Sequence, residues 1–465
     1  MQDHCYFMSN KIKSDDVLLC PDPPLESLSK ESSVKNYMET PVLFILTLFL
    51  LYQVNELSRS AANGILHDIV QSQKIEKRGI LKNTAPYSKR LMVFCLTLQG
   101  YSTRAYKFLR RSFENCLPHL NTLKNYRNKV DGSPGFSSPA LQMIKNKANE
   151  LKDKKLYVSL ACDDISIKQH VWYNGRSFTG FADTGDGPWK EKAKHVMFLM
   201  VVALNSSWKL PVAYFLIPDR FSSKNRAELI SHCILKLNET GAVLTNVVMD
   251  NCPVNYATYR ELGCKLTRNP ETLNTNLSYK NNIGIDVVAL FDPPHLSKLV
   301  RNALGHWRTL VDAKNRLVKW KHIFDLYNHQ KSEGFHLANK LTKQHIEFQK
   351  NPMKVKFAVQ ILSRSVANAL LTMKDLKIDG FNDVEGTVDY LMYFDSIFDV
   401  MNSKSLNQSY LKSPLTERNS ESWHKVFEET SDYICNLKTE NGIPVLKSKR
   451  YAAFLGMNEI SESSF

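Results

Sequence analysis

The chain has 465 residues and a formal net charge of +15, with 43% hydrophobic and 23% charged residues. This composition excludes a disordered or fibrous protein, and the length favours two to four domains. Between Lys74 and Lys155 there are 18 lysines and arginines against 5 aspartates and glutamates. Such a basic block is typical of proteins that bind nucleic acid or an anionic membrane, and a solvated basic surface is the alternative.

Residues 1–85 are predicted to be a poorly defined N-terminal region. Their apolar run over residues 41–54 is roughly fourteen residues long, whereas a membrane-spanning helix needs about twenty. The run also lies too deep in the chain for a signal peptide. We therefore predict a buried or interfacial helix and no membrane partner, with translated intron sequence as the alternative.

Residues 86–130 are predicted to form a helix-turn-helix that binds DNA. Ser102 can cap one helix, Pro118 ends it, and Asn121 or Thr122 can start the next. A plain helical bundle is the alternative. The basic residues on the outer faces are the candidates for DNA contact, namely Arg104, Lys107, Arg110, Arg111, Lys124 and Arg127.

Residues 150–292 have the pattern of an α/β layer. Strands that first form hairpins and then alternate with helices favour a mixed sheet, and Asn174-Gly175 is a hairpin signal. The expected strands and helices are, in order, Leu156–Cys162, Val171–Tyr173, Phe178–Phe181, His195–Leu204, Leu210–Ile217, the helix Ala227–Leu237, Val243–Met249, the helix Tyr256–Leu262, and Asp286–Phe291.

Residues 293–440 are predicted to form a separate α-helical domain. The apolar spacing is helical with few strand signals. The expected helices are Val318–Tyr327, His336–Gln349, Val355–Met373 and Val388–Met401.

Asp163 and Asp250 are the candidate catalytic and metal-binding residues. Each follows a buried apolar strand, and they are 87 residues apart (250 − 163). A buried carboxylate is costly unless it is paired or binds a metal, and carboxylates that hold two Mg²⁺ ions about 4 Å apart support phosphodiester chemistry. Helix capping or a turn is the alternative role, and Asp164 competes with Asp163 for the position.

Other catalytic patterns do not occur in the sequence. It has no GxxxxGK[ST] phosphate loop and no HExxH, GxSxG or GxGxxG motif. The nine cysteines include no CxxC pair and are typical of a reducing compartment, cytosol or nucleus. Cys116 and His119 have the spacing of half a zinc site but lack a matching pair upstream.

Several stretches, in one order from about residue 86 to the end, resemble the P-element transposases and their THAP-domain relatives. Gly100 to Leu123 is similar to the helix-turn-helix of that family, and the most specific match is Asp292-Pro-Pro-His-Leu-x-Lys. The remaining matches are Cys162-Asp-Asp-Ile-Ser-Ile-Lys168, Val247-Val-Met-Asp250, Lys354-Val-Lys-Phe-Ala-x-Gln-x-Leu-Ser363 and Phe398-Asp-Val-Met-Asn-Ser403.

The resemblance implies an RNase H-like catalytic domain that begins at 150–292 and is interrupted by a helical GTP-binding insertion at 293–440. It makes Asp163 and Asp250 the first and second metal ligands. It implies Mg²⁺ or Mn²⁺ and non-hydrolysed GTP as cofactors, DNA at transposon ends as a partner, homo-oligomers on DNA, and a location in the nucleus. The positions that match nucleotide contacts of the family are Lys340, Lys354, Val355, Ser363, Asp399 and Asn402.

Lys298 and Arg301, in the Asp292 motif, are expected either to position phosphate or to dock the insertion onto the nuclease core.

The sequence differs from the family pattern at both ends. A zinc-binding THAP module has no counterpart at the N-terminus. Residues 441–465 resemble the segment that returns to the nuclease fold, without the Asp-His-Leu-Glu run whose Glu is the third catalytic carboxylate; Glu459 and Glu462 lack that context. We therefore expect a catalytically incomplete transposase, and the alternatives are a domesticated or truncated DNA- and GTP-binding protein or an incomplete gene model.

Overall fold

The computed structural model describes residues 64–71, 87–127, 132–151, 154–173, 175, 178–269, 272–334, 336–337, 339–403 and 410–463. These residues fall into two compact units, one within 14–133 and one from Pro134 onward. Among the described residues, no helix is long and apolar enough to cross a bilayer. The apolar run at 41–54 lies outside them.

The N-terminal unit contains the predicted helix-turn-helix. The hydroxyl of Ser102 accepts a hydrogen bond from the N–H of Ala105 and caps the second helix, as predicted. The buried Tyr106 hydroxyl donates to the carbonyl oxygen of Pro118 at 2.5 Å and so fixes the turn that follows. The helices are α4 (Lys89–Tyr101), α5 (Thr103–Ser112) and α6 (Leu120–Arg127).

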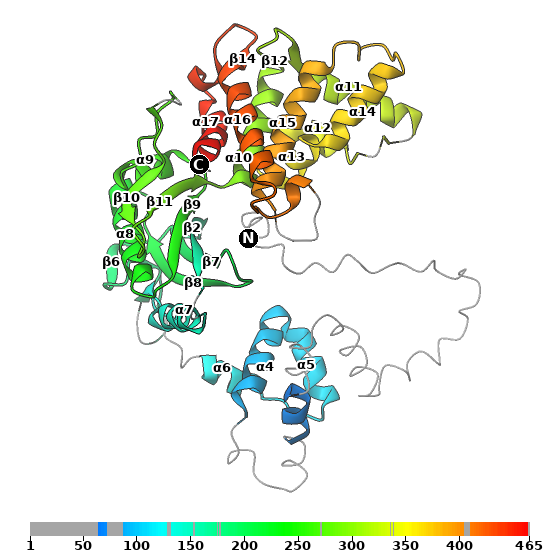
Figure 1. The fold of residues 1–465 in the computed structure, drawn as a ribbon. Helices are drawn as coiled ribbons and strands as arrows, with labels where there is room; N and C mark the ends of the chain where they lie inside the picture. Colours follow the sequence, from blue (N-terminus) through cyan, green and yellow to red (C-terminus); the bar gives the residue numbers. More distant parts are fainter. Residues whose placement is uncertain are drawn as a thin grey trace, which may run out of the picture. The chain divides into compact units, whose positions relative to one another are not determined.

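The second unit begins with a mixed α/β layer (Figure 1). Within the described residues, nine strands form one sheet in the order β10-β11-β9-β2-β7-β8-β5-β6, with β1 paired to β8. The strands are β1 (Gly135–Phe136), β2 (Tyr157–Ser166), β5 (Phe181–Asp183), β6 (Pro188–Lys192), β7 (His195–Ala203), β8 (Lys209–Ile217), β9 (Val243–Met249), β10 (Asn276–Lys280) and β11 (Asp286–Phe291).

Strand direction divides this sheet into two halves. Strands β2, β9 and β11 run parallel to one another, whereas β7 is antiparallel to β2 and β8 is antiparallel to β7. A two-stranded hairpin, β3 (Trp172–Tyr173) and β4 (Phe178–Thr179), extends between β2 and β5. The helices of this layer are α7 (Ser138–Glu150), α8 (Ser223–Asn238) and α9 (Pro253–Glu261). The predicted fold class, an RNase H-like mixed sheet, is confirmed.

The chain then leaves the sheet after β11 and forms a mostly helical region, drawn from yellow-green to orange-red in Figure 1. Its elements are α10 (Pro293–Trp307), β12 (Thr309–Val311), β13 (Leu317–Lys319), α11 (Trp320–Glu333), α12 (Lys343–Ile346), a 3-10 turn at Phe348–Lys350, α13 (Val355–Ile361), α14 (Arg364–Asp375), α15 (Glu385–Met401), a 3-10 turn at Tyr410–Lys412, α16 (Ser420–Asn436), β14 (Lys438–Thr439) and a 3-10 turn at Val445–Lys447.

Three details of this region differ from the sequence prediction. The small sheet β13-β12-β14 was missed, because strands of two or three residues are too short to show a period of two. The predicted helix Val355–Met373 is two helices. Ser363 has an extended backbone and its hydroxyl accepts from the N–H of Val366, so it ends α13 and caps α14. The predicted helix at 336–349 is reduced to α12, which starts at the capping box of Thr342.

The last helix, α17 (Tyr451–Ser463), returns to the sheet and packs against α10 and β11. The amide nitrogen of Asn251, just after β9, donates to the carbonyl oxygen of Ala452 at 2.8 Å. Trp307 and Phe454 stack with ring centroids 6.0 Å apart. The chain therefore leaves the sheet through α10 and returns to it through α17 at the same place.

Candidate functional site

Asp163 lies inside β2, three residues before the strand ends at Ser166. The prediction that the strand ended at Cys162 is therefore wrong, because pairing with β7 continues through both aspartates to Ser166. Successive residues of a strand point to opposite faces, so Asp163 and Asp164 face opposite ways. Arg226 on α8 donates to Asp164 Oδ2 at 2.5 Å, and its side chain is only 8% exposed. This ion pair engages Asp164, whereas Asp163 points to the other face of the sheet.

Three aspartates stand at the carboxyl ends of three neighbouring parallel strands. Asp163 and Asp250 each lie two residues beyond the last registered pair of β2 and β9, which is Ala161 with Val248. Asp292 lies one residue beyond the pair of Phe291 with Met249, between β11 and β9. We call this row the carboxylate edge. Ligand sites of open α/β sheets occur at this end of the strands.

His295, in the first turn of α10, lies between two of these carboxylates. Its Nδ1 is 3.8 Å from Asp250 Oδ2 and its Nε2 is 3.9 Å from Asp292 Oδ2. Asn255 donates a side-chain hydrogen bond to Asp250 Oδ1. Burial raises the pKa of Asp292 to about 7, and the negative charges of Asp163 and Asp250 act in the same direction.

The donor set of the carboxylate edge suits a hard divalent cation. Aspartate oxygens are the ligands that Mg²⁺ and Mn²⁺ prefer, and Asp163 and Asp250 would hold the ion. Within the ranges that the structure describes, no group of three or more His, Cys, Asp or Glu side chains is arranged to hold a metal ion. Asp163 and Asp250 would therefore supply only part of a coordination shell.

The sequence prediction did not assign a role to Asp292 or His295. Asp292 follows β11 as Asp250 follows β9, so the same strand-end pattern marks it in the sequence. His295 gives no such signal, because its contact with Asp250 joins residues 45 positions apart (295 − 250). Its place depends on how α10 starts from the sheet.

Lys298 and Arg301 are both buried, at 2% and 0% exposure. Arg301 Nη2 donates to the carbonyl oxygen of Pro352 at 3.1 Å, and its guanidinium lies 5.4 Å from the ring centre of Phe348. Of the two predicted roles for Arg301, these contacts favour docking of the insertion onto α10.

Part of the predicted nucleotide site forms one electrostatic cluster at the start of α14 and the end of α15. Ser363 caps α14, and the next residue, Arg364, has its Nε 3.9 Å from Asp395 Oδ2. Lys412 Nζ is 3.4 Å from Asp399 Oδ2. Burial raises the pKa of Asp399, and Lys412 and Arg364 oppose that shift. Asn402 Oδ1 is buried and has no hydrogen-bond partner among the described residues.

The other predicted nucleotide residues lie at the opposite end of α13. Lys354 is the N-cap of α13 and is exposed, whereas the side chain of Val355 is buried. Lys340 is exposed and lies just before α12. Since α13 has seven residues, about 10 Å of helix separates Lys354 from Ser363. A ligand that touches both groups must extend along α13.

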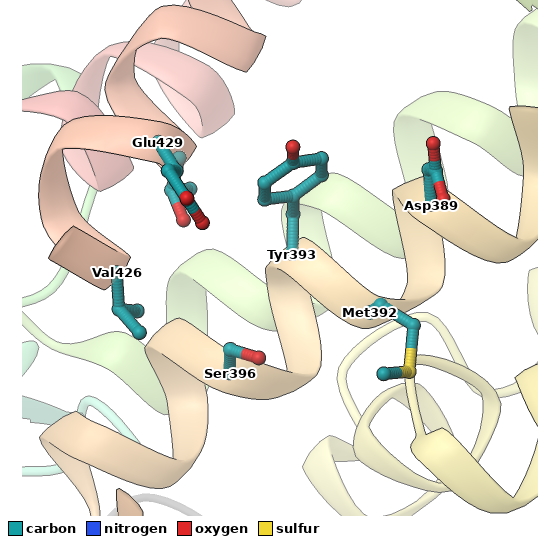
Figure 2. A pocket seen from close by; sticks show the side chains of 7 residues that line it. Asp389, Met392, Tyr393, Ser396, Val426 and Glu429 are labelled. Carbon is teal, nitrogen blue, oxygen red and sulfur yellow. The ribbon is translucent and has the colours of Figure 1, made fainter. Parts of the chain in front are cut away.

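A hollow of about 210 Å³ lies between α15 and α16 and contains none of the predicted nucleotide residues (Figure 2). Its two carboxylates already have basic partners, Arg316 for Asp389 and Lys425 for Glu429. It therefore offers little uncompensated charge for a ligand. The lining residues are Asp389, Met392, Tyr393, Ser396, Val426, Glu429 and Thr430.

The predicted DNA-contacting residues belong to the N-terminal unit. Arg104, Lys107, Arg111 and Lys124 are exposed on α5 and α6. Arg110 is half-buried, because its Nε donates to the carbonyl oxygen of Leu117 at 3.1 Å and its Nη1 donates to Asn115. The side chain of the sixth candidate, Arg127, lies outside the described set.

Comparison with known proteins identifies the regions described above. Residues 50–126 match the family described as Transposable element P transposase-like, HTH domain. Residues 132–263 match the TNP-like, RNase H N-terminal domain, and residues 294–414 match the TNP-like, GTP-binding insertion domain.

The chain is also similar to a curated protein and to a solved structure. It is 25% identical over 388 residues to the human DNA transposase THAP9, an alignment that covers 82% of this chain and 42% of that protein. The chain thus spans less than half the length of this relative. The Drosophila P element transposase strand transfer complex has a similar fold, with a TM-score of 0.64, 20% identity, and coverage of 84% of this chain and 82% of that one.

Proposed function

Because the chain belongs to the P-element and THAP-domain transposase family, we propose that it acts on DNA at the carboxylate edge of its RNase H-like sheet. The observation that carries the proposal is the alignment of Asp163 and Asp250 on neighbouring parallel strands. Asp164, the competing residue, is held by Arg226 on the other face. The exposed basic side chains of α5 and α6 would supply phosphate contacts.

The residues around the carboxylate edge support this chemistry. When bound, divalent metal would activate the attacking hydroxyl and stabilise the leaving oxygen of a phosphodiester. Asp163 and Asp250 would hold it, and the amide of Asn255 and the ring of His295 orient the Asp250 carboxylate from two sides. Asp292, whose side chain is 13% exposed, lies next to His295 at the end of β11.

We test this role by metal binding as well as by cleavage. Asp163→Asn and Asp250→Asn should each weaken Mn²⁺ binding, measured by calorimetry, by about tenfold or more and should abolish any metal-dependent nicking of DNA. The matched control is Asp286→Asn, at the opposite end of β11, which should leave both unchanged. Equal Mn²⁺ affinity in all four proteins would refute the assignment.

A second function, DNA and GTP binding without cleavage, is favoured by one observation. The described residues contain no complete three-ligand metal group. This alternative predicts salt-dependent DNA binding without Mg²⁺-dependent nicking, because phosphate contacts alone release counterions. Robust nicking that Asp163→Asn abolishes would exclude it.

The GTP proposal rests on the cluster at α14 and α15. The carboxylate of Asp399 would accept the N–H donors of a guanine edge, and the exposed Lys354 would face the phosphates. Asp399→Asn should lower GTP affinity by about tenfold or more and reduce the preference over ATP. The control is Asp389→Asn on the same helix, outside the cluster. An unchanged GTP-to-ATP preference in Asp399→Asn would contradict the proposal.

Two further parts of the proposal concern assembly and location. We expect the chain to form homo-oligomers on DNA and to reside in the nucleus. Sedimentation with and without DNA, and imaging of a tagged chain in cells, would test them. A monomer on DNA would contradict the expected homo-oligomer. Exclusion of the tagged chain from nuclei would contradict the expected location.

A further inference from the structure

The hairpin formed by β3 and β4 carries three exposed aromatic side chains, and we call it the aromatic hairpin. Trp172 is 62% exposed, Tyr173 is 53% exposed and Phe178 is 63% exposed. Tyr173 and Phe178 face each other across the strands, with ring centroids 5.0 Å apart. Exposed apolar clusters of this kind mark surfaces that bind something.

The base of the aromatic hairpin is fixed to the sheet. The N–H of Ile167 donates to the carbonyl oxygen of Lys194 at 2.8 Å, and the N–H of Ala193 donates to Gly180 at 2.9 Å. Gly180 has φ +104°, and a Cβ there would lie 2.0 Å from the carbonyl oxygen of His170. Only glycine allows the two ends of the hairpin to approach so closely.

The aromatic hairpin emerges from the same end of β2 that carries Asp163. That strand ends at Ser166, opposite His195 at the start of β7, and Trp172 follows Asp163 by nine residues (172 − 163). The segment that leads into the aromatic hairpin therefore starts at the sheet end that forms the carboxylate edge.

Exposed lysines flank the hairpin base, with one exposed acidic residue, Glu191, between two of them. Lys168 is exposed just before the hairpin, and Lys192 lies opposite Phe181 just after it, with Lys190 exposed on the same strand. Aromatic rings beside lysines are the combination that binds unpaired nucleic acid, since bases stack on rings and phosphates pair with amines. A blunt duplex offers few free base faces, because its bases are stacked on each other.

We propose that the aromatic hairpin stacks on unpaired DNA bases next to the carboxylate edge. The inference rests on the proposed function and adds the kind of DNA that the site selects, namely DNA with a single-stranded segment. Trp172 is the main stacking ring, because Tyr173 and Phe178 already contact each other within the hairpin.

The test compares two labelled DNAs by fluorescence anisotropy with the full chain, in EDTA so that binding alone is read. One is a blunt duplex and the other is the same duplex with a single-stranded overhang. Trp172→Ala should lower affinity for the overhang DNA by about tenfold and leave blunt-duplex affinity unchanged, because each stacked base contributes about that factor. Trp172→Phe should retain most of the affinity. The matched control is Phe324→Ala on α11, another exposed aromatic residue at 43%.

The outcomes separate this inference from the proposed function. Failure of the unchanged chain to bind either DNA would refute both. Normal DNA binding with no overhang-specific loss in Trp172→Ala would refute only the aromatic hairpin as a base-stacking surface. Loss of self-association in Trp172→Ala, seen by sedimentation with unaltered DNA affinity, would assign the surface to a second copy of the chain and overturn the inference.

Discussion

Asp395, on α15 beside the predicted nucleotide cluster, is expected to destabilise the fold when it is ionised. Its side chain is 12% exposed, and burial raises its pKa from 3.8 to about 6, with the charge of Asp399 acting in the same direction. The folded state therefore holds the proton more tightly than the unfolded chain. Protonation of Asp395 therefore stabilises the folded state. This stabilisation is complete below pH 3.8 and is lost as the pH rises through about 6. A shift of about two units corresponds to about 3 kcal/mol.

The substitution Asp395→Asn removes the charge at nearly constant volume. The variant should be more stable than the unchanged chain by up to about 3 kcal/mol at pH 8, and by roughly half of that at pH 5. Urea unfolding at the two pH values measures the difference. The control is Asp389→Asn on the same helix, which loses its ion pair with Arg316 and should gain no stability at pH 8. A gain that is absent, or equal at both pH values, would show that Arg364 and Lys412 outweigh the burial.

Four other changes test the packing and the DNA-binding unit. Arg226→Met should lower the free energy of unfolding by about 2–3 kcal/mol in urea, since Asp164 loses the partner that holds it; unchanged stability would contradict this role. Phe348→Ala should cost about 3–5 kcal/mol in the same assay, because its fully buried ring packs against Trp320, and a loss below 1 kcal/mol would argue against that packing. Gly456→Ala should speed hydrogen exchange in α17, because the added Cβ would lie 2.5 Å from Leu296; equal protection would refute the close approach. Arg104→Ala should reduce the slope of log affinity against log salt by about 0.9 if Arg104 contacts a phosphate, as titrations of DNA binding would show.

The main strands of the sheet could be predicted from the sequence because each is an apolar run bounded by turn residues. Val243–Met249 and Asp286–Phe291 have the predicted bounds, and the cap at Ser102 is confirmed because it depends on neighbouring residues alone. These strands and this cap are determined by residues that are close together in the sequence, so a short stretch of sequence is enough to predict them. The small sheet β13-β12-β14 joins segments far apart in the chain and gave no local pattern.

The candidate site shows the same division. Asp163 and Asp250 were proposed because both were expected to follow apolar strands. The sequence could not show that Asp164, and not Asp163, pairs with Arg226, because Arg226 is 62 residues away. Likewise, His295 lies near Asp250 because α10 starts beside the end of β9. Sequence spacing does not predict this contact. Which of the two adjacent aspartates forms an ion pair depends on the helix that packs on one face of the sheet, here α8 with Arg226.

The bond between Asn251 and the carbonyl oxygen of Ala452 joins residues 201 positions apart and has a consequence for folding order. Closing so long a loop costs entropy that nearby contacts do not, and contacts of high sequence separation form late. The central strands can pair before the helical region is complete, whereas α17 can dock only after the helices between them have folded. We therefore expect the segment after Asp250 to gain its final protection against hydrogen exchange last. The carboxylate edge would then reach its final structure only when the whole second unit has folded.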